Sequence, residues 1–119
     1  MPCVNGLSLP QKRCNVMPGG GANLNILVRA LGPTLGDFGV PGALANPTLD
    51  LVNSSGTVIR SNDNWKDSQR AEIEATGLAP HHDAESALWE AVAPGAYTAI
   101  VRGTGRTTGV ALVEVYNIP

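Results

Sequence analysis

The chain has 119 residues, a length that suits a single domain. Its net charge is −2, and it has only 8 Lys and Arg residues. Nucleic-acid binding requires clustered basic side chains, so this composition argues against it. No apolar run approaches the roughly 20 residues that a membrane-spanning helix needs. The composition is 43% hydrophobic and 15% charged, with 14 Gly and 9 Pro, and it favours short strands and turns over long helices.

Residues 1–23 are expected to form an irregular N-terminal segment with one short strand over residues 4–9. A run of glycines at residues 19–21 is typical of a hinge. The two cysteines of the chain, Cys3 and Cys14, both lie in this segment. We expect them to form a disulfide, which would stabilise the terminus and imply an oxidising compartment. Two free thiols on a flexible tail are the alternative, whereas a metal site is disfavoured because no second Cys or His pair lies nearby.

Six strands are predicted after this segment, from β-branched and apolar runs bounded by turn-forming residues. The last predicted strand is apolar on both faces and is therefore expected to lie inside a sheet. The sequence NSSG at residues 53–56 predicts a hairpin turn, and GTGRTTG at residues 103–109 predicts a second hairpin loop. The predicted strands cover residues 24–31, 48–52, 57–61, 86–92, 96–102 and 110–116.

Two connections differ from this pattern. Residues 32–47 contain too many Gly and Pro residues for a helix or a strand, yet their apolar side chains predict a compact excursion that packs against the core. Residues 67–76 are the one helical candidate, with Asp67 as the N-terminal cap and Gly77 in the left-handed conformation after the last turn. Together the elements predict an all-β domain over residues 24–119, a two-layer antiparallel, jelly-roll-like β-sandwich with one short helix.

The stretch SNDNWKD, residues 61–67, crowds Asx side chains around one of the two tryptophans. Carboxylate and amide oxygens are the ligands that calcium prefers, and acidic residues of a second loop are expected to converge with them. The alternative is a structural turn, in which the Asx side chains bond to the local backbone and Trp65 anchors the turn to the sheet. The candidate calcium ligands are Asn62, Asp63, Asn64, Asp67, Asp83 and Glu85.

Arg29 lies inside an apolar strand, and a buried guanidinium needs a partner. We expect a structural ion pair between Arg29 and Glu85, with Glu114 as the second choice of partner. The alternative is an arginine that awaits an anionic ligand.

The sequence His-His-Asp at residues 81–83 suggests zinc binding or a Ser-His-Asp site, but both interpretations are weak. Adjacent histidines on an extended chain point in opposite directions, and the G-x-S-x-G sequence of a nucleophile elbow is absent. Catalytic residues and enzymatic activity are therefore not expected.

Four blocks of sequence carry a resemblance to a known module. They are ILVRALGPTLGDFGVPGALANPTLDL, GTVIRSNDNWKDSQRAEIEATGLAP, DAESALWEAVAPGAYTAIVRG and TTGVALVEVYNI, and they lie within residues 26–118. In these blocks the chain resembles a β-rich domain found in large secreted proteins of environmental bacteria, often near their C-terminal ends. It is similar in outline to prepeptidase C-terminal sandwiches. This resemblance implies a non-catalytic module, outside the cell or on its surface, of a type that can bind calcium or extracellular polymers.

The chain departs from this family at residues 1–23, which replace the β-structure that usually precedes the first strong strand. The sandwich is therefore expected to lack a strand along one edge, and a neighbouring copy is expected to supply it. Three hypotheses follow. The favoured one is a structural protein that self-associates into filaments, the second is a calcium-stabilised module that engages an extracellular polysaccharide or protein, and the least favoured is an enzyme.

Overall fold

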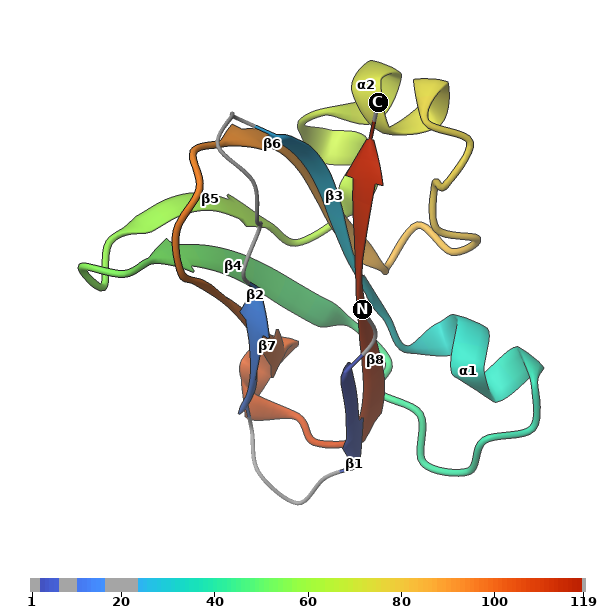
Figure 1. The fold of residues 1–119 in the computed structure, drawn as a ribbon. Helices are drawn as coiled ribbons and strands as arrows, with labels where there is room; N and C mark the ends of the chain where they lie inside the picture. The colour runs from blue at the N-terminus through green and yellow to red at the C-terminus, as the bar shows by residue number, and fades with distance from the viewer. Residues whose placement is uncertain (1–2, 7–10, 17–23, 119) are drawn as a thin grey trace.

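Eight strands form two antiparallel sheets that pack face to face (Figure 1). The computed structural model describes residues 3–6, 11–16 and 24–118, with the first two ranges and residue 106 described by their backbone alone. The first sheet has the order β1-β8-β3-β6, and the second sheet has the order β2-β7-β4-β5. The strands are β1 (Cys3–Gly6), β2 (Gln11–Val16), β3 (Leu24–Leu31), β4 (Pro47–Asn53), β5 (Val58–Asn62), β6 (Ser86–Val92), β7 (Tyr97–Gly103) and β8 (Val110–Ile118).

The strand order is that of a jelly roll, because consecutive strands alternate between the sheets except at β4 and β5. The predicted two-layer antiparallel sandwich is therefore confirmed. The hairpin predicted at residues 53–56 joins β4 to β5, and Gly56 takes a φ of 83° in its turn. The hairpin predicted at residues 103–109 is wrong, because this connection crosses from β7 in the second sheet to β8 in the first. Strand β8 lies inside the first sheet, as predicted, because it pairs with both β1 and β3.

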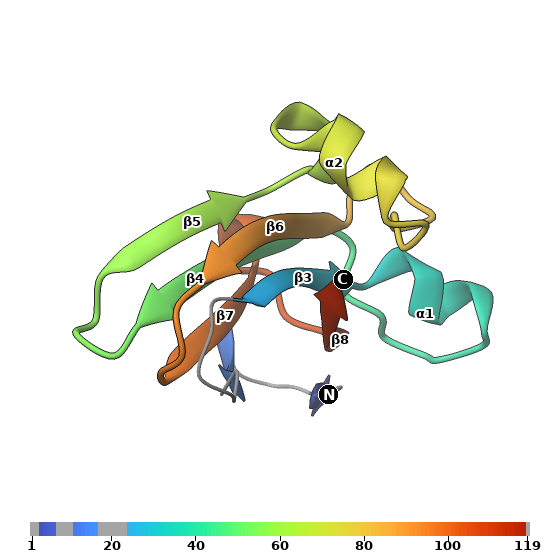
Figure 2. The same ribbon diagram turned by 45° about the horizontal axis from the view of Figure 1, so that its top comes forward.

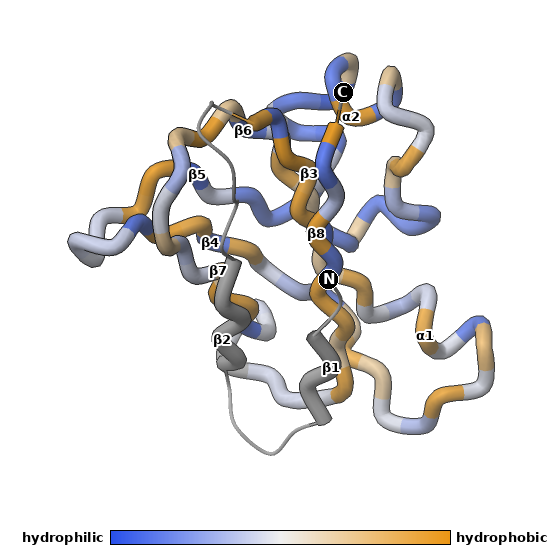
Figure 3. Tube along the Cα trace, in the orientation of Figure 1, coloured by the Kyte–Doolittle hydropathy of each residue, from blue (hydrophilic) through white to orange (hydrophobic). Residues whose placement is uncertain are grey.

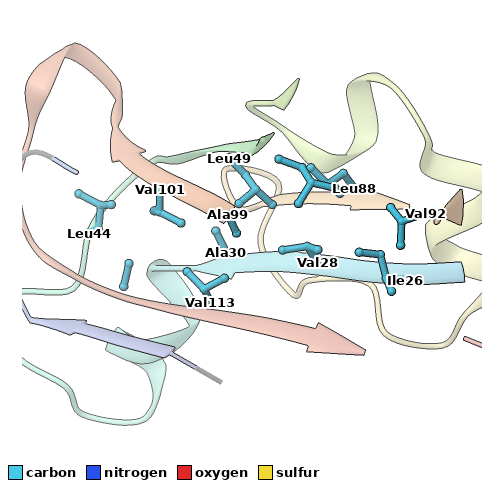
Figure 4. Packing of buried hydrophobic residues seen from close by; sticks show 12 residues of the cluster. Ile26, Val28, Ala30, Leu44, Leu49, Leu88, Val92, Ala99, Val101 and Val113 are labelled. Atoms are coloured by element: carbon cyan, nitrogen blue, oxygen red, sulfur yellow. The ribbon is translucent and has the colours of Figure 1, made fainter. Parts of the chain in front are cut away.

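The main core fills the space between the two sheets (Figure 4). Alternate residues of β3 point into it, namely Ile26, Val28 and Ala30, while Leu27 and Arg29 lie on the opposite face. The fully buried side chains of this core are all aliphatic, and the partly buried ring of Tyr97 packs against them. Its buried members are Ile26, Val28, Ala30, Leu44, Leu49, Leu51, Leu88, Val92, Ala99, Val101, Ala111 and Val113.

A second, smaller core covers the outer face of the first sheet. Leu27 of β3 and Ala87 of β6 are fully buried there, and they pack with Trp65 and Ile73 from the connection between β5 and β6. This connection contains helix α2 (Arg70–Ala75), which lies over the first sheet (Figure 2). Because both faces of β3 are buried, its sequence LNILVRAL is apolar almost without alternation.

The helix predicted over residues 67–76 is shorter than expected. A 3-10 turn covers Trp65–Asp67, and α2 begins only after Gln69, which occupies the N-cap position without a side-chain capping bond. The predicted capping role of Asp67 is therefore wrong, because Asp67 lies inside the 3-10 turn that directs Trp65 into the second core. Gly77 follows the helix with a φ of 75°, as predicted.

The N-terminal segment pairs with both sheets of its own chain. Strand β1 lies along β8, with Cys3 opposite Val113, and β2 lies along β7, with Cys14 opposite Ala99. We call these two strands the arm, and each forms the outermost strand of its sheet. The prediction that one sheet edge lacks a strand is therefore wrong, because the chain's own arm supplies one edge strand of each sheet. The cysteine side chains lie outside the described part of the chain, so the disulfide between them remains a prediction.

The excursion between β3 and β4 contains helix α1 (Pro33–Asp37), which the sequence did not predict. Proline suits the first position of a helix, and the carboxylate of Glu85 accepts hydrogen bonds from amides at its start. The base of the excursion is tightly held: the Leu44 amide donates to the Val110 carbonyl at 2.8 Å. A Cβ atom at Gly32 would lie only 2.0 Å from the Leu44 carbonyl oxygen, so the two backbone segments touch there.

The outer face of the second sheet carries polar side chains beside the buried Val52 and Ile100. Arg102 of β7 forms an ion pair with Asp50 of β4 at 2.6 Å, and the Ser61 hydroxyl donates to Asp50 at 2.7 Å. Figure 3 shows hydrophobic residues along β3 and β8 of the first sheet and mainly hydrophilic residues in the connection that leads from β5 toward α2. Within the described ranges, none of the helices has the length and apolar character needed to cross a membrane.

Candidate functional site

Residues 61–67 run along the outer edge of β6 and close it with hydrogen bonds. Asn62 is buried at the end of β5, and its Oδ1 accepts a hydrogen bond from the Ala87 amide at 3.0 Å. The Trp65 amide donates to the Glu85 carbonyl, also at 3.0 Å. Backbone groups at the edge of the first sheet are thereby satisfied within the chain, which reduces the tendency of this edge to pair with another strand.

Gln69 continues this closure, although a lone glutamine carries no sequence pattern that would have singled it out. Its Nε2 donates to the Trp89 carbonyl at 2.7 Å, and its Oε1 accepts from the Trp89 amide at 2.8 Å. The side-chain amide therefore takes the place that the backbone of a further strand would occupy beside β6.

Trp65 holds this stretch against the sheet. Its side chain is 4% exposed and packs in the second core with Leu27 and Ile73, the position expected of an anchor. Asn62 and Trp65 thus fix the two ends of the turn. These contacts agree with the structural interpretation of SNDNWKD.

The six candidate calcium ligands do not converge on one point. Asn62 and Glu85 direct their oxygens to buried backbone amides. Asp83 accepts a hydrogen bond from the Lys66 ammonium at 2.8 Å, and this bond lowers the pKa of the Asp83 carboxyl. Within the described residues, no group of three or more His, Cys, Asp or Glu side chains is placed to hold a metal ion.

The remaining candidates lie at the surface. Asn64 donates to the Asp67 carboxylate at 3.4 Å. The amide of Asn46, oriented so that its nitrogen faces these acceptors, donates to Asp63 at 3.2 Å and to the Ala84 carbonyl at 3.0 Å. A shallow surface depression is lined by Asn64, Lys66, Asp67, Asp83 and Ala84, so a protein cation already lies among its acidic groups.

Arg29 is paired with Glu114, which corrects the first choice of partner, Glu85. The two residues are register partners on β3 and β8, and Arg29 Nε lies 2.6 Å from Glu114 Oε1. The other guanidinium nitrogens donate to the Leu78 carbonyl at 2.8 Å and to the Tyr116 hydroxyl at 3.1 Å. Burial raises the pKa of the Tyr116 hydroxyl. The guanidinium thus joins two strands and the end of the α2 connection, which agrees with a structural role.

Glu85 is fully buried, and its carboxylate holds helix α1 in place. Its Oε2 accepts hydrogen bonds from the Gly32 amide at 2.9 Å and from the Thr34 amide at 2.8 Å. Its Oε1 accepts from the Thr34 hydroxyl at 2.7 Å and from the His82 amide at 3.3 Å. These partners replace the solvation that the carboxylate loses on burial.

His82 adds a second attachment of α1. Its Nε2 lies 2.6 Å from the Asp37 carboxylate at the end of the helix, and this hydrogen bond is the main reason why the pKa of His82 is raised. Residues 81–83 therefore hold two neighbouring segments in place, since His82 bonds to Asp37 of the excursion and Asp83 bonds to Lys66 of the 3-10 turn.

A hollow of about 270 Å³ lies between α1 and the outer face of the first sheet. Its walls are mainly apolar, with the Arg29–Glu114 ion pair among its lining residues. Phe38, at the end of α1, stands at this hollow with 78% of its side chain exposed. The lining residues are Arg29, Leu31, Thr34, Leu35, Phe38, Pro80, His81, Leu112 and Glu114.

Comparison with known proteins relates the chain to several solved structures. No family model matches the sequence, and no curated protein matches it. The pre-peptidase C-terminal domain of a collagenase from Bacillus anthracis is 12% identical, with a TM-score of 0.47, and the match covers 91% of this chain and 89% of that domain. The CspB protease of Clostridium perfringens is 11% identical, with a TM-score of 0.50, and the match covers 96% of this chain but 25% of the protease. Carbohydrate-binding module CBM36, in complex with calcium and xylotriose, is 12% identical with a TM-score of 0.36, covering 96% of this chain and 88% of the module.

At these identities the likeness concerns the fold alone. The chain spans a quarter of the CspB protease, so the activity of that protein is not carried over to it. A pre-peptidase C-terminal domain is among the structures to which the chain is similar, and this is the outline similarity that the sequence predicted.

Proposed function

We propose that the chain is a non-catalytic structural module of the bacterial exterior whose copies associate by exchanging the arm. The position of the arm supports this proposal, because residues 3–6 and 11–16 supply the outermost strand of both sheets. Exchange of an identical element between copies repeats pairings that already exist in one copy, so it needs no new complementary surface.

The opposite edges of the two sheets are poorly suited to strand pairing. At β6, the side chain of Gln69 is hydrogen-bonded to the backbone amide and carbonyl of Trp89. At β5, the register with β4 shifts after Leu51, and Arg60 is held by Glu90 at 2.9 Å. Irregular register and charged side chains discourage edge pairing. Pairing between copies is therefore directed to the side of the arm.

The arm is joined to β3 by a segment that contains three consecutive glycines, residues 19–21, a composition typical of flexible connections. Reciprocal exchange of the arm between two copies gives a closed dimer. Serial exchange, in which each copy passes its arm to the next, gives a filament.

The non-catalytic and extracellular parts of the proposal have separate support. Arg29 and Glu85 are engaged in hydrogen bonds that hold strands and loops together. The two cysteines of the arm favour an oxidising compartment. A calcium-stabilised adhesion or polysaccharide-binding module remains the alternative, and the position of Lys66 beside Asp83 weighs against its calcium ion.

Cross-strand disulfide trapping tests the exchange. Asn15 of β2 and Thr98 of β7 are register partners, and Cα atoms of such partners lie roughly 4.5–5.5 Å apart, within the reach of a disulfide. Both are replaced by cysteine in a chain that carries Cys3→Ser and Cys14→Ser. After refolding at millimolar concentration and oxidation, we expect covalent dimers and larger multimers on a non-reducing gel.

A matched control uses a pair on two strands, β4 and β5, with which the arm does not pair. Asp50 and Ser61 are register partners within the β4–β5 hairpin, so cysteines at these positions should link only within one chain. If the Asn15→Cys, Thr98→Cys variant also links only within one chain at every protein concentration, arm exchange is refuted.

A further inference from the structure

The two cysteines of the chain occupy corresponding positions on the two strands of the arm. Cys3 of β1 is the register partner of Val113, and Cys14 of β2 is the register partner of Ala99. Val113 and Ala99 are both fully buried in the main core between the sheets. The two cysteine positions therefore flank one core from opposite sheets, at the edges that the arm supplies.

A disulfide between these positions would join the two strands of the arm across the sandwich. The disulfide between strands B and F of antibody domains shows that such a bond can span two packed sheets. Strands β1 and β2 are connected through residues 7–10 alone, so the bond would close a loop over residues 3–14. Because both of its ends belong to the arm, the bond does not tie the arm to β7 or β8.

We propose that the redox state of Cys3 and Cys14 controls how fast the arm is exchanged between copies. This inference rests on the proposed function and adds the regulation of the same two strands. Strand β1 pairs with β8 over four residues, and β2 pairs with β7 over six. With free thiols, each of these short pairings opens and re-forms by itself. With the disulfide, the two strands must leave their sheets together.

The disulfide slows release of the arm because it restricts the conformations of the released state. In the chain-entropy description, a cross-link that closes a loop of this size lowers the population of the open state by about a hundredfold. Another copy can bind the arm only after its release, so the rate of exchange should fall by a similar factor. Oxidised copies therefore keep the arm that they hold, whether it is their own or that of a neighbour.

The switch is a thiol–disulfide exchange in which electrons and protons balance. The two thiols of the arm give two electrons and two protons to an external disulfide, which becomes two thiols. A dithiol reductant reverses this step. Thiols stay reduced inside the cell and are oxidised outside it. Exchange of arms therefore precedes oxidation, and oxidation then fixes the partners of each copy.

Mixing of labelled copies tests the switch on the parent chain. Assemblies are prepared separately from unlabelled and from isotope-labelled protein, and native mass spectrometry follows the appearance of mixed assemblies with and without dithiothreitol. We expect mixing to be about a hundredfold faster in the reductant. The matched control, Cys3→Ser with Cys14→Ser, should mix at the fast rate in both conditions. If the trapping at positions 15 and 98 shows arm exchange but the parent mixes equally fast in both conditions, redox control is overturned.

Hydrogen exchange gives a second readout that does not require assembly. The amides of β2 that pair with β7 should exchange about a hundredfold more slowly in the oxidised chain than in the reduced chain. The Asn53 amide, which donates to the Thr57 carbonyl in the β4–β5 hairpin, should exchange equally in both states. Equal protection of the β2 amides in both states overturns the switch. Failure of arm exchange itself is recognised separately, because the trapping then gives no interchain disulfides.

Discussion

The Glu85 carboxylate binds Thr34 twice, accepting hydrogen bonds from its amide at 2.8 Å and from its hydroxyl at 2.7 Å. Glu85 lies just before β6, and Thr34 lies in α1, so this contact joins parts of the chain that are 51 residues apart. All the partners of the carboxylate in the described part of the chain are neutral amides and a hydroxyl. The position of the whole excursion, Phe38 included, depends on this buried group.

Glu85→Gln should lower the free energy of unfolding by roughly 2–4 kcal/mol, because a glutamine places an NH₂ donor opposite amides that need an acceptor. Urea-induced unfolding measures the change. Glu72→Gln, at an exposed position of α2, is the control and should change stability by less than about 0.5 kcal/mol. Equal stability of the Glu85 variant and the parent would contradict the role of the carboxylate as an anchor.

Gln69→Ala should expose the backbone edge of β6 at Trp89. The substitution removes the hydrogen bond from the Trp89 amide to Gln69 Oε1, and the loss of one such bond costs about 1 kcal/mol. Hydrogen exchange of the Trp89 amide should therefore become roughly five times faster. Gln69→Glu is the matched variant: it keeps an acceptor for the amide but loses the donor to the Trp89 carbonyl. The amide should therefore stay protected in the glutamate variant. Unchanged exchange after Gln69→Ala would show that the edge is closed by other groups.

Calcium should leave the thermal stability of the chain almost unchanged. A ligand at 100 times its Kd stabilises a protein by about 2.7 kcal/mol, which a melting curve detects easily. Lys66 already pairs with Asp83, and Asn62 and Glu85 are committed to backbone amides. We expect the Tm in calcium and in chelator to agree within about 1 °C. A Tm that rises with calcium concentration would contradict this prediction and support a calcium site in residues 61–67.

The His82–Asp37 ion pair should make the attachment of α1 depend on pH. Because its pKa is raised from 6.5, His82 adds stability that is fully present below pH 6.5 and is lost as the pH rises through the raised value. NMR titration should give His82 a pKa above 6.5, and Asp37→Asn should remove the shift. The Asp37 variant should melt lower than the parent in mild acid and nearly equally at alkaline pH. A difference in Tm that grows with pH would contradict this assignment.

Cys3 and Cys14 should form an intrachain disulfide in the oxidised protein. Their register partners, Val113 and Ala99, are both fully buried in the main core, so the two cysteines occupy matching positions at the edges of the two sheets. Alkylation followed by mass spectrometry should label both thiols only after reduction. Labelling without reductant would show free thiols. Because both cysteines belong to the arm, this disulfide would move with the arm during exchange.

Much of the sandwich could be predicted from apolar and β-branched runs bounded by turn-forming residues. The strand at residues 24–31 and the strand at residues 86–92 match β3 and β6, because both are dense in residues that favour strands. The crossing of residues 103–109 between sheets could not be predicted, since a Gly- and Thr-rich turn forms either a hairpin or a longer connection. Helix α1 was missed because it depends on Glu85, which is distant in sequence.

The candidate site was predicted less well for a related reason. The side-chain oxygens of Asn62 and Asp83 could bind calcium, but in the structure they accept hydrogen bonds from an amide and from an ammonium group. The residue types alone do not distinguish these roles. Glu85 was assigned to Arg29 by charge, but the register of β3 and β8 places Glu114 directly beside the guanidinium. The role of Gln69 depends on its contact with Trp89, twenty residues away.

The excursion that carries α1 is clamped where Gly32 touches Leu44, yet its tip is open. A Cβ atom at Gly39 would meet no described atom within 4 Å, whereas the Gly42 carbonyl accepts a hydrogen bond from the Val110 amide at 2.8 Å and belongs to the base. Foreign peptides grafted between these two glycines should therefore leave the sandwich intact, since the fixed base keeps the ends of the insert in place. Arm-exchanged filaments would then display such a graft on every subunit, which makes the tip a natural position for engineering a repetitive scaffold.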